Sequence, residues 1–232
     1  MRAAGLLAWS FIRQNRWPTI ALLAWVALSG GLAKQEASQS LEEALYLYKL
    51  AMVYVIGFTA FLAASVIQSE RSSRRILAVL SKSVSRSEYL LGIVLTFAGI
   101  AAGCCLVMLF TGAWIFGRSS LVSLLELMAA VLAACLLAGT ASLLFSTFLN
   151  PILAVVAASA LLAASSAVRN SFPLRELVLP AYPLMSSIME FSFDSGWQVS
   201  GSALLGAVVE AAVVWMVACW VFAHRDIAVA VD

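Results

Sequence analysis

Residues 69–89 read SERSSRRILAVLSKSVSRSEY and lie between two long apolar stretches of the sequence. The segment carries five of the fourteen lysines and arginines of the chain, yet its centre, from Ile76 to Leu80, is apolar. A connecting loop that only faces water is polar along its whole length. The pattern therefore predicts a short helix with a buried face between two membrane spans.

The composition predicts an all-α integral membrane protein with a single transmembrane domain over residues 1–232. Of its residues 63% are hydrophobic and only 11% are charged, and the mean hydropathy is +0.99. Soluble domains carry about 25% charged residues. The formal net charge is only +2, and the basic residues cluster beside the apolar stretches instead of forming one tract. Nucleic acid is therefore not an expected partner.

A helix needs about 20 mainly apolar residues to cross the hydrocarbon layer of a membrane. The sequence predicts six such spans: 17–33, 46–67, 89–116, 122–149, 151–168 and 202–223. Asn150 and Pro151 separate the fourth span from the fifth, because proline fits the first turn of a helix and interrupts one further in. We expect a tight turn between antiparallel helices there.

Two segments outside the spans have predicted roles. Residues 1–16 predict a short helix at the cytoplasmic surface, with Trp9 at headgroup depth. A secretory signal is the alternative for the first span, but sixteen residues are long for the start of such a signal. Residues 169–201 are apolar in part and broken by Pro180 and Pro183. They predict a re-entrant or interfacial helical pair on the outer side.

The distribution of basic residues sets the orientation, because cytoplasmic loops carry the excess of lysine and arginine. With the N-terminus inside, nine basic residues are cytoplasmic: Arg2, Arg13, Arg16, Arg71, Arg74, Arg75, Lys82, Arg86 and Arg225. Five are outside: Lys34, Lys49, Arg118, Arg169 and Arg175. We therefore expect a multi-pass protein of the inner (cytoplasmic) membrane with both termini in the cytoplasm.

The segment between the second and third spans, residues 70–86, predicts an amphipathic helix. At 100° per residue its apolar side chains fall within an arc of about 160°. They are Ile76, Leu77, Val79, Leu80 and Val84, and Arg74, Arg75, Ser81 and Lys82 lie opposite. The apolar ridge needs either the membrane surface or a groove on another protein, and the pattern alone favours neither.

The run from Glu70 to Gly92, ERSSRRILAVLSKSVSRSEYLLG, resembles the segment after the second span in type-2 permeases of the ATP-binding-cassette (ABC) exporter superfamily. The matching residues are Glu70, Leu77, Leu80, Val84, Ser85, Arg86, Leu90, Leu91 and Gly92. The chain departs at Ser83, where the family often has proline, and at Ile93, where lysine is common. GTASLLFSTFLN at 139–150 and FAHRDI at 222–227 resemble the family's fourth span and C-terminal ending.

In this family the short helix is a coupling helix that docks in a cleft of the ATPase subunit. The resemblance implies buried contacts from Ile76, Leu77, Val79 and Leu80, and polar contacts to the ATPase or to lipid phosphates from Arg74, Arg75 and Lys82. It also implies two ATPase subunits per complex, a second copy or relative of this chain, and surrounding membrane lipids as partners.

The chain contains no G-x-x-x-x-G-K-[ST] sequence. ATP and magnesium are therefore expected in the partner ATPase, and this chain is expected to be a transport subunit without a cofactor or enzymatic activity. The substrate would be exported and is expected to be amphipathic or lipid-like. A different class of function is a non-transporting scaffold that recruits an ATPase to a larger complex, for example in cytochrome maturation or motility.

Polar and aromatic residues inside or beside the spans are candidates for a substrate path. Glu210 lies about 13 Å into the sixth span, where an ionisable group suggests a function. The alternative is a protonated glutamate bonded to a serine or threonine on another span. Glu126, near the outer mouth of the fourth span, is either a path residue or an exposed or paired surface carboxylate. Tyr182 and Phe191 fit an exit gate and an aromatic belt equally well.

The remaining candidates predict packing and no catalytic or metal site. The four cysteines, Cys104, Cys105, Cys135 and Cys219, lie in apolar stretches without CxxC spacing, and the one histidine is His224. We expect buried apolar thiols. Gly99, Gly103, Gly112 and Gly139 predict close approach between helices.

Overall fold

A computed structural model describes residues 2–72, 85–117, 120–164, 179–193 and 199–224. Regular structure in these ranges is α-helical. The helices are α1 (Arg2–Gln14), α2 (Arg16–Glu36), α3 (Leu41–Ser72), α5 (Arg86–Phe116), α6 (Leu121–Ser146), α7 (Pro151–Ala164), α9 (Ala181–Met189) and α10 (Gly201–His224). The all-α fold class predicted from the sequence is confirmed for the described residues.

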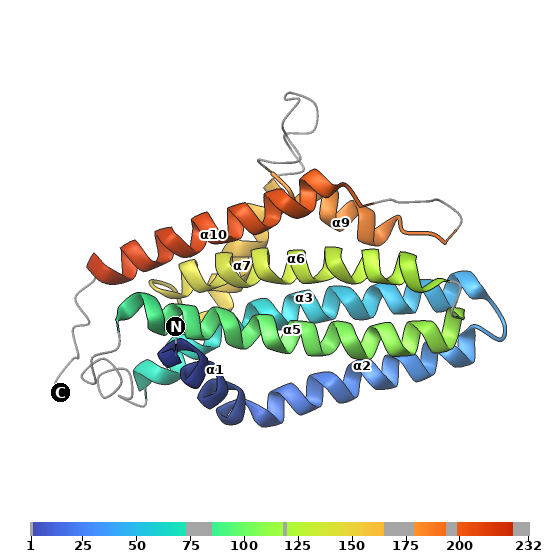
Figure 1. Cartoon of the computed structure of the whole chain (residues 1–232), viewed down its shortest axis with the longest axis horizontal. Coiled ribbons are helices and arrows are strands. Elements are labelled where there is room, and N and C mark those ends of the chain that lie inside the picture. Colours follow the sequence, from blue (N-terminus) through green and yellow to red (C-terminus); the bar gives the residue numbers. More distant parts are fainter. Residues whose placement is uncertain (1, 73–84, 118–119, 165–178, 194–198, 225–232) are drawn as a thin grey trace.

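The long helices lie side by side in a bundle, with α6 at its centre (Figure 1). Helix α6 packs against α3, α5, α7, α9 and α10, and most of its residues are buried. Its sequence is apolar on all sides, which is typical of a helix surrounded by other helices or lipid. The short helix α1 lies obliquely across one end of the bundle, and the C-terminal end of α10 lies at that same end (Figure 1).

Four helices are long and apolar enough to cross a membrane, judged by length and composition. They are Leu41–Gln68, Ser87–Phe116, Leu121–Ser146 and Gly201–His224. The predicted spans 46–67, 89–116, 122–149 and 202–223 correspond to these helices. The structure thus confirms four of the helices on which the membrane-protein prediction rests, while the count of six spans stays a prediction.

The other two predicted spans form helices of a different character. Helix α2 has 21 residues, but polar and small residues such as Thr19, Ser29 and Gly30 make it less apolar than the four. Helix α7 has 14 residues and is about 21 Å long by its rise, which is shorter than a hydrocarbon layer of about 30 Å. The predicted end of its span, residues 165–168, lies outside the described residues.

The turn predicted at Asn150 and Pro151 is confirmed. Helix α6 ends at Ser146, three residues earlier than the predicted span, because the chain turns at 147–149. Asn150 then caps α7, since its side-chain oxygen accepts a hydrogen bond from the amide of Leu153 at 2.9 Å. Pro151 occupies the first helical position, where its missing N–H costs no hydrogen bond.

The predicted N-terminal helix is present as α1, and it packs against the start of α5. Ala4, Ala8 and Phe11 are buried on one face of α1, at the spacing of successive helical turns. The Thr96 hydroxyl of α5 donates to the carbonyl of Ala8 at 3.3 Å. A side chain at Gly92 would lie 3.0 Å from Leu7, so glycine is what permits this approach.

The predicted close approach at glycines is confirmed at two of the four positions. A β-carbon at Gly139 would lie 2.7 Å from the Phe97 ring, and one at Gly112 would lie 2.6 Å from the Tyr48 hydroxyl. A β-carbon at Gly99 would make only a 4.0 Å contact, and one at Gly103 would meet nothing within 4 Å. The prediction is therefore wrong for Gly103, where no described residue lies within 4 Å of an added β-carbon.

Candidate functional site

A cavity of about 440 Å³ lies between α3, α6, α7 and α9. Its volume falls in the range of small-molecule binding sites, which are about 300–1,000 Å³. From α3 it is lined by Val53, Ile56, Gly57 and Ala60, which are spaced three and four residues apart and share one helix face. These residues lie near the middle of the apolar run Leu41–Gln68, so the cavity lies midway along a helix of membrane-spanning length.

Small side chains create the space. Gly57 and Ala60 on α3 face Ala134 and Ala138 on α6, where larger residues would fill the gap between the two helices. A β-carbon on Gly57 would meet nothing within 4 Å, so this glycine borders open volume instead of a packed neighbour. Small side chains on two of the four lining helices therefore contribute to the volume of the cavity.

The lining is apolar apart from two hydroxyl groups, on Ser159 of α7 and Tyr182 of α9. A buried water molecule needs two to four polar partners, and a site with two hydroxyls at separate places holds water poorly. A hydrocarbon chain suits these walls better. Tyr182 is the one predicted path residue that lines this cavity.

Helix α9 forms one wall of the cavity and is tied to α3 by a charged side chain. The Lys49 ammonium donates to the carbonyl of Met189 at 2.8 Å. Met189 is the last residue of α9, where carbonyl groups lack helical partners and the negative end of the helix dipole favours a cation. Lys49 thus fixes the C-terminal end of α9 over the bundle.

A second charged side chain holds the chain that leads into α10. Glu126 of α6 accepts a hydrogen bond at 2.5 Å from the amide of Val199, and both residues are buried, with exposures of 5% and 1%. A carboxylate–amide bond of this kind contributes about 1.5–3 kcal/mol. The alternative of an exposed or paired surface carboxylate at Glu126 is wrong, because the side chain is buried and accepts the bond from the buried Val199 amide.

The predicted gate residue Phe191 is part of a packed aromatic cluster. It is 1% exposed, and its ring lies edge-on to Phe193 at a centroid distance of 5.2 Å. Phe193 contacts Phe116 at 4.7 Å, and Phe116 contacts Tyr48 at 5.6 Å. Phe191 therefore does not line the cavity. Phe193 connects this cluster to Phe116 of α5, which in turn contacts Tyr48 of α3.

Glu210 lies on α10, away from the cavity. Its Oε2 atom is buried and has no hydrogen-bond partner among the residues that the structure describes. Two threonines on other spans, Thr140 and Thr111, donate to carbonyl groups of their own helices, and the buried Ser142 hydroxyl has no partner among the described residues either. Of the four predicted path residues, Tyr182 lines the cavity, and the assignment of Glu210, Glu126 and Phe191 to a substrate path stays a prediction.

The predicted ATPase-binding residues lie outside the described residues: Arg74, Arg75, Ile76, Leu77, Val79, Leu80 and Lys82. The structure describes the chain again from Ser85 onward. Ser85 caps α5, since its side chain accepts a hydrogen bond from the Glu88 amide at 3.2 Å. The Ser85 hydroxyl also lies 3.3 Å from the Glu88 carboxylate, an arrangement close to a capping box.

The cysteines agree with their predicted role as packing residues. Cys104, Cys105 and Cys135 are buried and Cys219 is half-buried, and all four are free thiols. Within the described ranges, no group of three histidine, cysteine, aspartate or glutamate side chains is placed to hold a metal ion.

The sequence did not single out Lys49 or Gly57 as site residues. Lys49 carried a signal, because it is a cation inside an apolar stretch. Gly57 carried none, since glycine is frequent in transmembrane helices and its effect depends on which helix faces it. No protein-family model matches the chain, and no curated protein matches it. The resemblance to type-2 permeases thus stays a prediction from the sequence.

Proposed function

We propose that this chain is the membrane-spanning permease subunit of an ABC exporter, driven by a separate ATPase subunit. The observation that carries the proposal is the sequence from Glu70 to Gly92, in which an amphipathic segment between two membrane-length helices matches the coupling segment of type-2 permeases. In this proposal the ATPase binds ATP and magnesium, and the present chain binds neither.

The surroundings of this segment support a coupling role. It joins the end of α3 to the start of α5, and α5 begins at a capped turn. Immediately after the cap, α5 is packed against α1 through Gly92 and through Tyr89, whose ring lies 5.8 Å from Phe11. A force applied to the segment would therefore move α5 and α1 together.

The cavity supports an amphipathic or lipid-like substrate. It offers apolar walls midway along a helix of membrane-spanning length, two hydroxyls, and a short helix, α9, as one wall. We propose that the apolar part of the substrate occupies this cavity and that displacement of α9 opens it outward. The tethers at Lys49 and Glu126 would then define the closed state.

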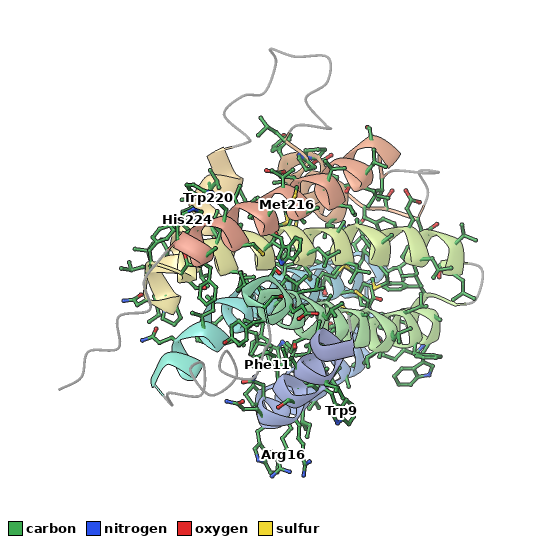
Figure 2. The ribbon with its side chains drawn as sticks, turned by 60° about the vertical axis from the view of Figure 1, so that its left-hand side comes forward. Trp9, Phe11, Arg16, Met216, Trp220 and His224 are labelled. Atoms are coloured by element: carbon green, nitrogen blue, oxygen red, sulfur yellow. The ribbon has the colours of Figure 1, made fainter. Side chains whose placement is uncertain are left out.

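The exposed face of α10 supports a partner within the membrane. Met216, Trp220 and His224 follow one another at four-residue spacing along it and are exposed (Figure 2). In the proposal this stripe contacts lipid or a second permease subunit, either identical or related. Both termini would face the cytoplasm of a cell with this chain in its inner membrane.

The docking claim is tested by replacing Leu77 and Leu80 with aspartate. Affinity-purified wild-type protein is expected to retain an ABC ATPase, and the double variant is expected to lose it, because two charges cannot enter an apolar cleft. The control is Ala78→Asp with Ser81→Asp, which at 100° per residue adds the same charge on the polar side of the same segment. Equal retention by both variants would refute docking.

Transport is separated from scaffolding by ATPase stimulation in the purified complex. Candidate lipids and amphipathic compounds should stimulate the ATPase of a transporter, and Gly57→Leu should abolish this response without releasing the ATPase. A complex that retains its ATPase but responds to no compound would favour the scaffold.

A further inference from the structure

A second recess, of about 250 Å³, lies at the corner between α1 and α2, and we call it the corner groove. It is lined by Trp9, Ile12, Arg13, Arg16, Thr19 and Ile20. Figure 2 shows Phe11 turned toward the bundle while Trp9 and Arg16 lie on the outer side of this corner. The corner groove is thus separate from the cavity beneath α9, and it shares no lining residue with it.

The accessible surface of the corner groove is apolar, although two arginines line it. This combination arises when the aliphatic stems of arginine lie along a groove and the charged heads reach its rim. Trp9 and Ile20 are 69% and 53% exposed, which leaves apolar area uncovered beside the two cations. The corner groove therefore offers a hydrocarbon surface with positive charge at its edge.

Neither Arg13 nor Arg16 forms an ion pair or hydrogen bond with any residue that the structure describes. The guanidinium of Arg16 lies over the Trp17 ring at 5.6 Å, a contact that leaves its N–H groups free to donate. Elsewhere in the described chain, the lysines use their donors: Lys34 bonds Trp114 and Lys49 bonds Met189. The two arginines are therefore available to an external anion.

With α2 as a membrane span, which is the prediction from the sequence, the depth of the corner groove matches a lipid headgroup. Helix α2 has 21 residues and a length of about 31 Å by its rise, which equals the thickness of a hydrocarbon layer. A membrane with one boundary at Glu36 therefore has its other boundary at Arg16. The arginines then lie at the phosphates, and Ile20 lies one turn inside the hydrocarbon.

We propose that the corner groove binds an anionic phospholipid, with its phosphate between Arg13 and Arg16 and the first part of one acyl chain along Ile12 and Ile20. Guanidinium groups bind phosphate oxygens through paired N–H donors, which explains two arginines at one rim. A free phosphate would use the charges and leave the apolar surface exposed. The inference does not depend on the proposed export function, since the binding needs no ATPase.

The test uses the full-length protein in nonionic detergent, with phosphatidylglycerol, phosphatidylcholine and inorganic phosphate as separate probes. Wild-type protein is expected to bind phosphatidylglycerol about tenfold or more tightly than phosphatidylcholine, because each arginine near an anionic headgroup contributes about 1 kcal/mol. Arg13→Gln with Arg16→Gln should abolish this preference. Lys34→Gln, which removes one charge at the other end of α2, should leave it unchanged.

Two outcomes would overturn the proposal. One is inorganic phosphate competing as well as the lipid, which means a plain anion site. The other is an equal loss of preference in Lys34→Gln, which means diffuse attraction to net charge. If the double variant does not fold, wild-type protein is cross-linked to a photoactivatable phosphatidylglycerol and the labelled residues are identified. Labelling of residues 9–20 supports the site, and labelling only elsewhere refutes it.

Discussion

The cavity beneath α9 and the corner groove are both apolar recesses at helix junctions, but they use their charged residues in opposite ways. At the cavity, the Lys49 ammonium donates to the carbonyl of Met189, and the Glu126 carboxylate accepts from the amide of Val199. Both side chains therefore stabilise the fold. At the corner groove, Arg13 and Arg16 bond to no described residue and point outward. The cavity is therefore bordered by a helix that the chain itself holds in place, whereas the corner groove is open to a ligand from outside the chain.

The comparison teaches how to interpret ionisable residues in an apolar chain. A charge near a membrane is expensive to bury and therefore marks a function or a fold-specific bond. Where a backbone donor or acceptor lies within hydrogen-bond distance, as at Val199 or Met189, the charge is structural. Where none lies nearby, the charge is available for a ligand.

Glu126→Ala should have the largest effect, a loss of about 3 kcal/mol in the free energy of unfolding. The buried amide of Val199 would lose its acceptor and have no water to replace it. Thermal unfolding in detergent measures the loss, and Glu126→Gln, which keeps an acceptor oxygen, should recover part of it. Exposed Glu190→Ala is the control. Equal stability of Glu126→Ala and the control would mean that the charge is not structural.

Gly57→Leu should weaken binding of a hydrocarbon-chain ligand to the cavity about tenfold, or about 1.4 kcal/mol. The new side chain enters open volume, so folding should be preserved. Binding of a fluorescent fatty-acyl probe measures the effect. Gly31→Leu is the matched control, because Gly31 is also exposed with nothing within 4 Å of an added β-carbon but lies on α2. If both variants bind the probe alike, the cavity is not its site.

Lys49→Met should cost about 1 kcal/mol of stability and loosen α9 specifically. The methionine keeps the length of the side chain but cannot donate to the Met189 carbonyl. Hydrogen exchange should quicken in α9 while exchange in α1 stays unchanged. Faster exchange at both ends of the bundle would contradict a local tether and weaken the distinction between the two regions.

Ser85→Ala should have the smallest effect, a loss of up to about 1 kcal/mol confined to the first turn of α5. It removes the side-chain acceptor for the Glu88 amide, and Ser85→Asp, which supplies another acceptor, should restore the turn. Hydrogen exchange of that turn is the measurement. Acyl-probe binding in the cavity should not change, and a change there would mean that the two ends of the bundle are coupled without an ATPase.

The sequence was informative where the physical cause is local. The turn at Asn150 and Pro151 follows from the missing N–H of proline and from a side chain that caps the next helix. The buried cysteines follow from their apolar neighbours along the chain. Prediction failed where the bonding partner is distant in the sequence. The pattern around Glu126 indicates a surface carboxylate, yet its side chain is bonded to the amide of Val199, which comes 73 residues later. Gly103 was predicted to lie against another helix, but no described residue lies within 4 Å of an added β-carbon there.

From the sequence it was possible to predict a helical chain that is apolar enough for a membrane, and to place its main helices. These properties are predictable because hydrophobicity and helix termination depend on neighbours along the chain. Three features became visible only in the folded chain. Small residues on α3 and α6 border a cavity, and Lys49 and Glu126 form hydrogen bonds with backbone groups. Arg13 and Arg16 are bonded to no described residue. Each of these depends on which helix faces which, and packing between distant segments fixes that choice.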